Sequence, residues 1–229
     1  MGKKHELPSF NDFLKELKEK SVTNSKPVEE IEEKKYFLIV SEGERTEPLY
    51  FNYFKKLLPR HLLDTIDIKG EGDNTINIVK KAIELRAIRE KDILLPNYTE
   101  CWAVYDKDDF PAVRFNQAVE LAANENIGSA HSNQSFELWY ILHFQYLNTC
   151  LHRSDYIPLL SKHLEFKYEK NDTNVVKHLF TKCNIRQAVE WAEMLENEFV
   201  GDTPSNSCPS TMVYKLVKSL LSYCKYEDF

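Results

Sequence analysis

The sequence predicts an α/β fold, in which a parallel sheet is flanked by helices and followed by a helical C-terminal portion. Three observations lead to this prediction. Short apolar runs end abruptly in turns, each run precedes a segment with helical spacing of apolar residues, and the chain after residue 147 shows helical spacing. Strands that alternate with helices along a chain are typical of parallel sheets.

The first strand is expected at Tyr36–Ser41, where an unbroken apolar run stops at Glu42 and Gly43. Runs of this kind are typical of strands that are buried on both faces. The next segment, Glu47–Leu58, has apolar residues at helical spacing. Glu42 should therefore lie at the carboxyl end of a strand, where open α/β sheets place their sites. A solvated turn residue explains the same position.

Further strands and helices follow in alternation. The strands are expected at Thr65–Lys69, Cys101–Tyr105 and Ile127–His131. The helices are expected at Ile76–Arg89, Pro111–Glu125 and Phe136–Tyr146, the last one capped by Ser135.

The chain after residue 147 is expected to be helical. Two helices are predicted at Ser154–Lys167 and Gln187–Phe199, and Thr203–Pro209 is predicted to be a loop. Ser210 is expected to cap a last helix, Thr211–Tyr223.

These elements suggest three parts. Residues 1–35 hold eight Lys and eight Asp or Glu and are interpreted as an N-terminal extension with a polar linker. Its amphipathic piece Phe10–Leu17 could dock on a partner or be a surface helix. Residues 36–147 form the α/β core, and residues 148–229 form a helical subdomain packed on it.

Composition limits the partners that the chain can have. The 229 residues carry a net charge of −6, which predicts no general affinity for polyanions. Any contact with nucleic acid must then come from a local patch or from metal ions. The segment 148–186 is one such patch, because it has seven Lys or Arg against four acids, with aromatic residues among them. Basic and aromatic residues together can bind a nucleic-acid strand, but a solvated helical face explains them equally well.

The cysteines and the apolar runs bear on the compartment. The five Cys residues are scattered, odd in number and without CxxC spacing, so we expect reduced thiols and no zinc site. The N-terminus lacks the apolar region of a signal peptide, and the longest apolar run, Phe136–Leu147, is too short to span a bilayer. We therefore expect a cytoplasmic protein with no membrane segment.

Four acids follow the predicted strands. Glu42 follows the first, Asp106 and Asp108 follow the third, and Glu137 comes after the fourth. The carboxyl ends of parallel strands share one edge, and Asp106 and Asp108 would share a side of an extended segment while Lys107 points away. Converging carboxylates repel one another unless a cation compensates their charge.

Hard oxygen ligands of this kind suit Mg²⁺ or Mn²⁺, which could orient a phosphodiester and activate water. Two other interpretations stay open at this point. Asp106–Asp109 could be a turn leading into a helix N-terminus, where acids are favoured, and Glu137 could interact with a helix dipole.

Several catalytic motifs are absent from the sequence. There is no GxxxxGK[ST] loop of a P-loop NTPase, no GxSxG nucleophile elbow and no HExxH zinc motif. The seven His residues are interpreted as surface or core residues.

An ordered set of motifs runs through the chain. It comprises Ser41–Pro48 with Tyr50-Phe51, the turn and helix Gly72–Val79, Val104–Asp109 with Pro111 and Phe115-Asn116, Ser132–Trp139 with Leu142–Phe144, and Pro209–Thr211 with Val213-Tyr214. This set resembles the RloB family, a branch of the Toprim-like proteins, over residues 36–220. Two residues depart from the family pattern: Gln134 stands where proline is expected, and Ser41 stands where Cys or a similar small residue is common.

The resemblance implies a Toprim-like fold with a Toprim-type metal site. By this resemblance Glu42 would act in acid/base chemistry and metal binding, while Asp106 and Asp108 would bind Mg²⁺. Glu47 could bind metal or position water, and Glu137 would complete the site.

Three further residues are assigned to the substrate. Asn133 matches a position of the same family motif, and Arg45 or Lys107 could stabilise charge on the phosphate. Related systems pair such an effector with a separate AAA-type or SMC-like ATPase in bacterial antiviral defence, in keeping with the missing ATP-binding loop.

The hypothesis from sequence is therefore a Mg²⁺- or Mn²⁺-dependent nuclease that cuts RNA or DNA. Two alternatives stay open. The chain could be a non-catalytic, nucleic-acid-binding or regulatory subunit held by the ATPase, or it could be a phosphotransfer enzyme acting on nucleotides. Whether it forms a homo-oligomer also stays open.

Overall fold

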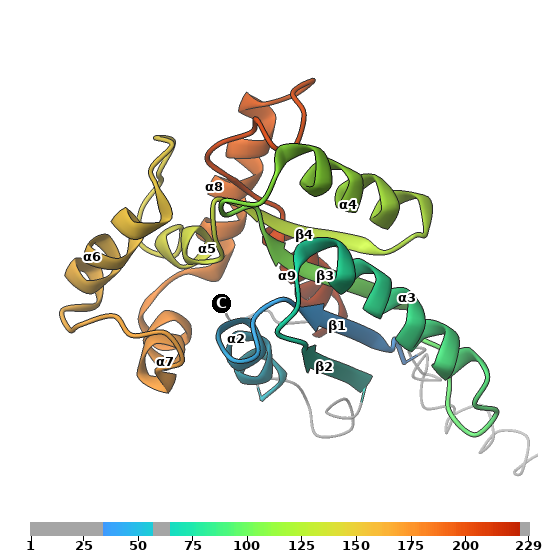
Figure 1. Ribbon diagram of the computed structural model, residues 1–229. Coiled ribbons are helices and arrows are strands. Elements are labelled where there is room, and N and C mark those ends of the chain that lie inside the picture. Colours follow the sequence, from blue (N-terminus) through green and yellow to red (C-terminus); the bar gives the residue numbers. More distant parts are fainter. Residues whose placement is uncertain (1–33, 57–64, 225–229) are drawn as a thin grey trace, which may run out of the picture. The chain divides into compact units, whose positions relative to one another are not determined.

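The structure is a computed structural model that describes residues 34–56 and 65–224 (Figure 1). All of these belong to one compact unit, Lys34–Phe229. Residues 1–33 of the expected N-terminal extension, including the amphipathic piece Phe10–Leu17, lie outside the described residues.

Four parallel strands form most of the sheet, as the alternation of strands and helices predicts. They are β1 (Phe37–Ser41), β2 (Ile66–Gly70), β3 (Glu100–Asp106) and β4 (Gly128–Asn133). The order of strands in the sheet is β2-β1-β3-β4-β5. In this register Ser41 lies beside Val104, and Asp106 lies beside Ser132, so the carboxyl ends of the three central strands meet at one edge.

A fifth, antiparallel strand corrects the prediction for the C-terminal portion. Ser210, expected as a helix cap, forms β5 with Thr211 (Ser210–Thr211), which pairs with β4. The hydroxyls of Thr211 and Ser132 share a hydrogen bond of 2.9 Å, and both residues are fully buried. Two polar residues give no apolar alternation, so their strand is not visible in the sequence pattern.

Eight helices are described. They are α2 (Thr46–Lys55), α3 (Thr75–Glu90), α4 (Ala112–Asn124), α5 (Glu137–Ile141), α6 (Arg153–Leu164), α7 (Thr173–Lys182), α8 (Ile185–Glu198) and α9 (Val213–Cys224). Helix α7 is not among the predicted helices. The side chain of Asp172 caps it by accepting a hydrogen bond from Asn174 N–H at 2.8 Å.

Strand β1 is buried on both faces of the sheet, because successive side chains of a strand point to opposite sides. Leu38 and Val40 pack in one apolar cluster with helices α3 and α4, which cover one face in Figure 1. Phe37 and Ile39 belong to a second cluster that reaches through α2 and α5 into the C-terminal helices α6–α9. The helical portion is thus continuous with the core of the sheet.

The predicted helix Phe136–Tyr146 is much shorter than expected. Helix α5 ends at Ile141, although the chain stays buried through His143. The apolar residues after Ile141 are therefore explained by burial of the chain and not by a longer helix. Ser135 does not cap the helix either, since its hydroxyl donates to the Glu137 carboxylate at 2.7 Å.

The expectation that all cysteines are reduced is wrong for one pair. Cys150 and Cys208 form a disulfide across 58 residues, while Cys101 and Cys183 are free. The fold packs the segment after α5 against the loop before β5, and linear spacing gives no sign of this meeting. The argument from reduced thiols to a cytosolic compartment loses its support here.

Across the described part of the chain, none of the helices combines the length and the apolar character that crossing a membrane requires.

Trp139 tests the shared core. Its side chain is fully buried and makes edge-on ring contacts with Tyr50 and His143. Trp139→Ala should lower the free energy of unfolding by about 3–5 kcal/mol, because it removes a large side chain and leaves a cavity. Urea denaturation measures the change. Leu94→Ala is the control, since Leu94 is 86% exposed and its loss should cost less than about 0.5 kcal/mol. Equal effects of the two variants would contradict this packing.

Candidate active site at the carboxyl edge of the sheet

A cavity of about 500 Å³ lies at the carboxyl edge of β1 and β3. Five acids proposed from sequence as catalytic line it, namely Glu42, Glu47, Asp106, Asp108 and Glu137. Glu42 comes from the turn after β1 and Glu47 from the start of α2. Asp106 ends β3, Asp108 lies in the turn after it, and Glu137 begins α5. The parallel register thus brings together acids that are up to 95 positions apart in the sequence, Glu42 and Glu137.

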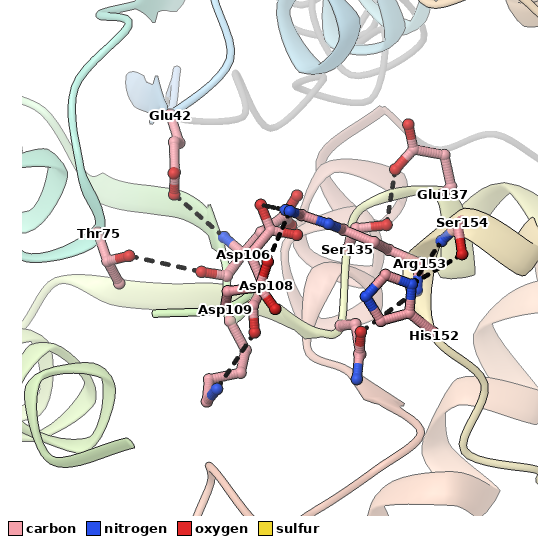
Figure 2. A network of polar contacts seen from close by, with 12 residues as sticks. Glu42, Thr75, Asp106, Asp108, Asp109, Ser135, Glu137, His152, Arg153 and Ser154 are labelled. Carbon is pink, nitrogen blue, oxygen red and sulfur yellow. Dashed lines mark hydrogen bonds and ion pairs between the residues drawn. The ribbon is translucent and has the colours of Figure 1, made fainter. Parts of the chain in front are cut away.

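Glu42 lies directly after β1, and its backbone N–H donates to Val104 O at 2.9 Å. Its carboxylate accepts a hydrogen bond from Asp106 N–H at 3.3 Å (Figure 2). Burial raises the pKa of Glu42 to about 7, and the charges of Asp108 and Glu47 add to the rise. A carboxyl group with this pKa can be either protonated or ionised near neutral pH.

Glu47, in the first turn of α2, is 5% exposed. Its carboxylate accepts a hydrogen bond from Gly43 N–H at 3.3 Å. A β-carbon at Gly43 would overlap this carboxylate, so the close approach requires glycine. Burial raises the pKa of Glu47, and the charge of Glu137 raises it further.

Asp106 and Asp108 each bury one oxygen, Oδ1, that has no hydrogen-bond partner among the described residues. Burial, together with the charges of Glu47 and Glu137, raises the pKa of Asp106 well above its ordinary value. The expected extended segment is wrong at Asp108, whose φ of 42° is left-handed. Both side chains nevertheless line the cavity.

Glu137 is the acid with the most hydrogen-bond donors around it. Its carboxylate accepts from Ser135 Oγ at 2.7 Å and from Tyr168 Oη at 3.1 Å. Lys170 Nζ lies 3.3 Å from Oε1 of the same group. Burial raises the pKa of the Tyr168 hydroxyl, and the Glu137 charge adds to this rise, so Tyr168 remains a donor.

The three residues assigned to the substrate have different surroundings. Arg45 is exposed and lines the acid cavity. Lys107 is not among the lining residues, and its Nζ donates to the carbonyl of Asp108 at 3.2 Å. Asn133 is buried at the end of β4, and its amide donates to the carbonyls of Pro204 and Ser205. Only Arg45 is therefore in a position to meet a ligand of the cavity.

Sequence reasoning missed the cations that the helical portion supplies. Lys170 and Asn171, between α6 and α7, line the cavity, and Thr46 Oγ1 donates to Asn171 Oδ1 at 3.3 Å. Arg153, the first residue of α6, pairs with Asp108 and with Asp109. The local excess of basic residues in 148–186 signals such a role, but it does not indicate which of them face the acids.

The aromatic residues of that segment are largely unavailable for stacking. Tyr156 and Tyr168 are buried in the main core, and Phe180 is packed against it. Phe166, with 36% of its surface exposed, lines a separate hollow with Lys177 and Lys182.

The acids have the chemistry of a site for Mg²⁺ or Mn²⁺. Among residues 34–56 and 65–224, no three His, Cys, Asp or Glu side chains are gathered closely enough to form a ready-made metal site. Mg²⁺ commonly keeps several waters and uses only one or two carboxylates. The two buried oxygens without a partner, on Asp106 and Asp108, fit that mode of binding.

A larger cavity of about 750 Å³ lies beside α4, β4 and the segment that follows α8. Trp102 and Phe199 contribute to its lining, together with His131, whose pKa burial lowers to about 4. It lacks a group of unpaired carboxylates and contains none of the predicted site residues. Chemistry, and not size, therefore makes the acid cavity the candidate active site.

Comparison with known proteins identifies the family. The model of the RloB-like protein family matches residues 37–220, which include all five acids. The chain therefore belongs to the RloB-like family, as the motifs predict. No curated protein and no solved structure matches it.

Glu42→Gln tests the electrostatic cost of the site. The pKa of Glu42 is about 7 in the folded chain against an ordinary 4.5, so wild type loses stability as the pH rises through this interval. The neutral Gln does not titrate. Its stability advantage over wild type should therefore grow by about 2–3 kcal/mol between pH 5 and pH 8.

Urea denaturation of both proteins without metal, at several pH values, measures this difference. Glu120→Gln, an exposed acid on α4, is the control and should show no such trend. A constant difference between wild type and Glu42→Gln across the range would contradict the raised pKa.

Proposed function

We propose that this RloB-like protein is a metal-dependent nuclease with a Toprim-like fold that hydrolyses phosphodiester bonds of RNA or DNA. One observation carries the proposal. Seven acidic side chains, the five candidate catalytic acids together with Glu44 and Asp73, line one cavity at the carboxyl edge of the sheet. Two of them, Asp106 and Asp108, bury oxygens that have no partner among the described residues. Such a cluster is costly without a cation.

Mg²⁺ or Mn²⁺ fits the two buried oxygens without a partner, so Asp106 and Asp108 would hold the ion together with water. Glu42 lies next to them, because its carboxylate accepts a hydrogen bond from Asp106 N–H. Bound there, the ion would supply charge stabilisation for a phosphodiester and activation of water. Glu42, with a pKa of about 7, is suited to accept the proton of an attacking water near neutral pH. Glu47 and Glu137 would orient that water and keep the local charge negative.

Arg45 and Lys170 are the cations that line the same cavity. Lys170 is paired only with Glu137 among the described ion pairs, and its side chain is 64% exposed, so it can turn toward a phosphate. Cations aimed at a phosphate stabilise the charge that develops during its displacement. Lys170 takes the role that the sequence analysis gave to Lys107.

The biological setting belongs to the same proposal. The net charge of −6 makes a local, metal-assisted contact with nucleic acid more reasonable than general adhesion. We propose an effector in bacterial antiviral defence of the RloB type. Its partner would be a separate AAA-type or SMC-like ATPase, because the chain has no P-loop motif.

A second candidate function is a non-catalytic, nucleic-acid-binding or regulatory subunit of the ATPase complex. One observation favours it. Arg153 and Lys170 already pair with Asp108 and Glu137, so part of the acid charge is balanced within the chain. Acids balanced in this way could serve folding or partner contacts without chemistry.

Cleavage assays separate the two functions. Wild type, tested alone and with its neighbouring ATPase, should cut at least one of tRNA, single-stranded RNA and duplex DNA when Mn²⁺ is present. Glu42→Gln and Asp106→Asn should each lower the rate by at least about 100-fold, because each removes a charge from the site. Gel analysis of the products measures the rates.

Glu120→Gln is the matched control and should cut like wild type, since Glu120 is exposed on α4 away from the cavity. If Glu42→Gln cleaves at the wild-type rate, the nuclease assignment is wrong. No cleavage of any substrate, with or without the ATPase, favours the binding subunit.

Lys170→Ala should lower kcat/KM for cleavage by about 10–100-fold, because it removes a cation from the mouth of the cavity. Steady-state cleavage with a labelled oligonucleotide measures this change. Lys167→Ala is the control, since Lys167 lies in the same loop but pairs with Glu169 and does not line the cavity. Equal losses in both variants would show that general charge, and not the position of Lys170, matters.

A further inference from the structure

Arg153 connects the helical portion to the acid cavity, although no motif singles it out. It begins α6, and its guanidinium faces two acids of the turn that follows β3 (Figure 2). One nitrogen, Nη1, pairs with Asp108 Oδ2, and the other, Nη2, lies 2.8 Å from Asp109 Oδ2. A guanidinium suits this arrangement because its nitrogens form a rigid planar fork.

Gln134 fixes the backbones on both sides of this pair. Its side-chain Oε1 accepts a hydrogen bond from Arg153 N–H at 3.2 Å. Its main-chain carbonyl accepts from Asp108 N–H at 2.9 Å. One residue therefore sets the distance between the start of α6 and the turn that carries Asp108. A proline at this position could not make the side-chain contact with Arg153.

The two oxygens of Asp108 have different surroundings as a result. Oδ2 is held by Arg153, while Oδ1 is buried and has no hydrogen-bond partner among the described residues. Oδ1 of Asp106 is buried without a partner in the same way, and both side chains line the acid cavity. Because Arg153 occupies Oδ2 of Asp108, only Oδ1 is available to a ligand, and the ion pair fixes the direction in which Oδ1 points.

We propose that Arg153 is a positioning residue, which holds Asp108 through Oδ2 so that Oδ1 is presented to Mg²⁺ or Mn²⁺. The inference rests on the metal site of the proposed function. Groups that orient a ligand contribute to metal affinity although they do not touch the ion. The helical portion then takes part in metal binding through α6 and does more than cover the sheet.

An alternative role for Arg153, competition with the metal ion, predicts the opposite change in metal affinity. If Arg153 were a counter-ion that competes with the metal for Asp108, its removal would tighten metal binding. The partner Asp109 argues for the positioning role, because it keeps the second nitrogen of the fork occupied and is itself 76% exposed. The fork is therefore anchored from outside the cavity.

Mn²⁺ binding to the full-length protein, measured by electron paramagnetic resonance and by calorimetry, tests this inference. Arg153→Ala should weaken Mn²⁺ binding by about 10–100-fold. Arg153→Lys, which keeps the charge without the fork, should fall between this variant and wild type. Asp109→Asn, which weakens the outer anchor, should show a smaller loss of about 2–5-fold. Arg114→Ala, an exposed Arg on α4, should bind like wild type.

Metal affinity and cleavage are measured separately, so the two proposals can fail separately. If wild type binds Mn²⁺ but cuts nothing, the nuclease proposal is overturned. The Mn²⁺ affinities of the Arg153 variants then still decide whether Arg153 positions Asp108. Wild-type or tighter affinity in Arg153→Ala overturns the positioning role, as does a wild type that binds no Mn²⁺. If Arg153→Ala does not fold, Arg153→Lys and Asp109→Asn decide, and wild-type affinity in both overturns the proposal.

Discussion

The mutual repulsion of carboxylates at one edge of the sheet is the constraint on which this structure depends. Because β1, β3 and β4 pair in parallel, their carboxyl ends lie at the same edge of the sheet, and so do the acids that follow them. Burial makes the repulsion stronger, since water is removed from groups that carry like charges. The raised pKa values of Glu42 and Asp106 come first from burial, and the charges of neighbouring acids raise them further.

The helical portion supplies much of the compensation. Helix α6 begins with Arg153, and the segment between α6 and α7 brings Tyr168 and Lys170 to Glu137. The balance is incomplete, because Asp106 and Asp108 each keep a buried oxygen without a partner among the described residues. Ion pairs therefore compensate Glu137 and one oxygen of Asp108, whereas the Oδ1 atoms of Asp106 and Asp108 stay without a partner in the described part of the chain. These two oxygens are suited to bind a cation.

Several elements could be predicted because their signals are local. The apolar run at Phe37–Val40 is visible as a buried strand, and the acid that follows it is fixed by the end of the run. The elements that sequence reasoning missed depend on distant contacts. Strand β5 exists because Ser132 and Thr211 meet across 79 residues, and the Cys150–Cys208 disulfide exists because two loops meet. Helix α5 is shorter than its apolar run, since burial there does not come from helical periodicity.

The sequence by itself determined the α/β class and the family motifs. It also determined that Glu42, Asp106 and Glu137 lie at or after the ends of three strands, because strand periodicity and parallel pairing follow from local pattern. Only the tertiary structure decided which cations face these acids, and that Lys107 and Asn133 lie outside the cavity while Lys170 and Arg153 contact its acids. The physical reason is that ion pairing depends on distance in space. Helical packing brings residues of α6 and the following loop to the sheet edge without any fixed spacing in the sequence.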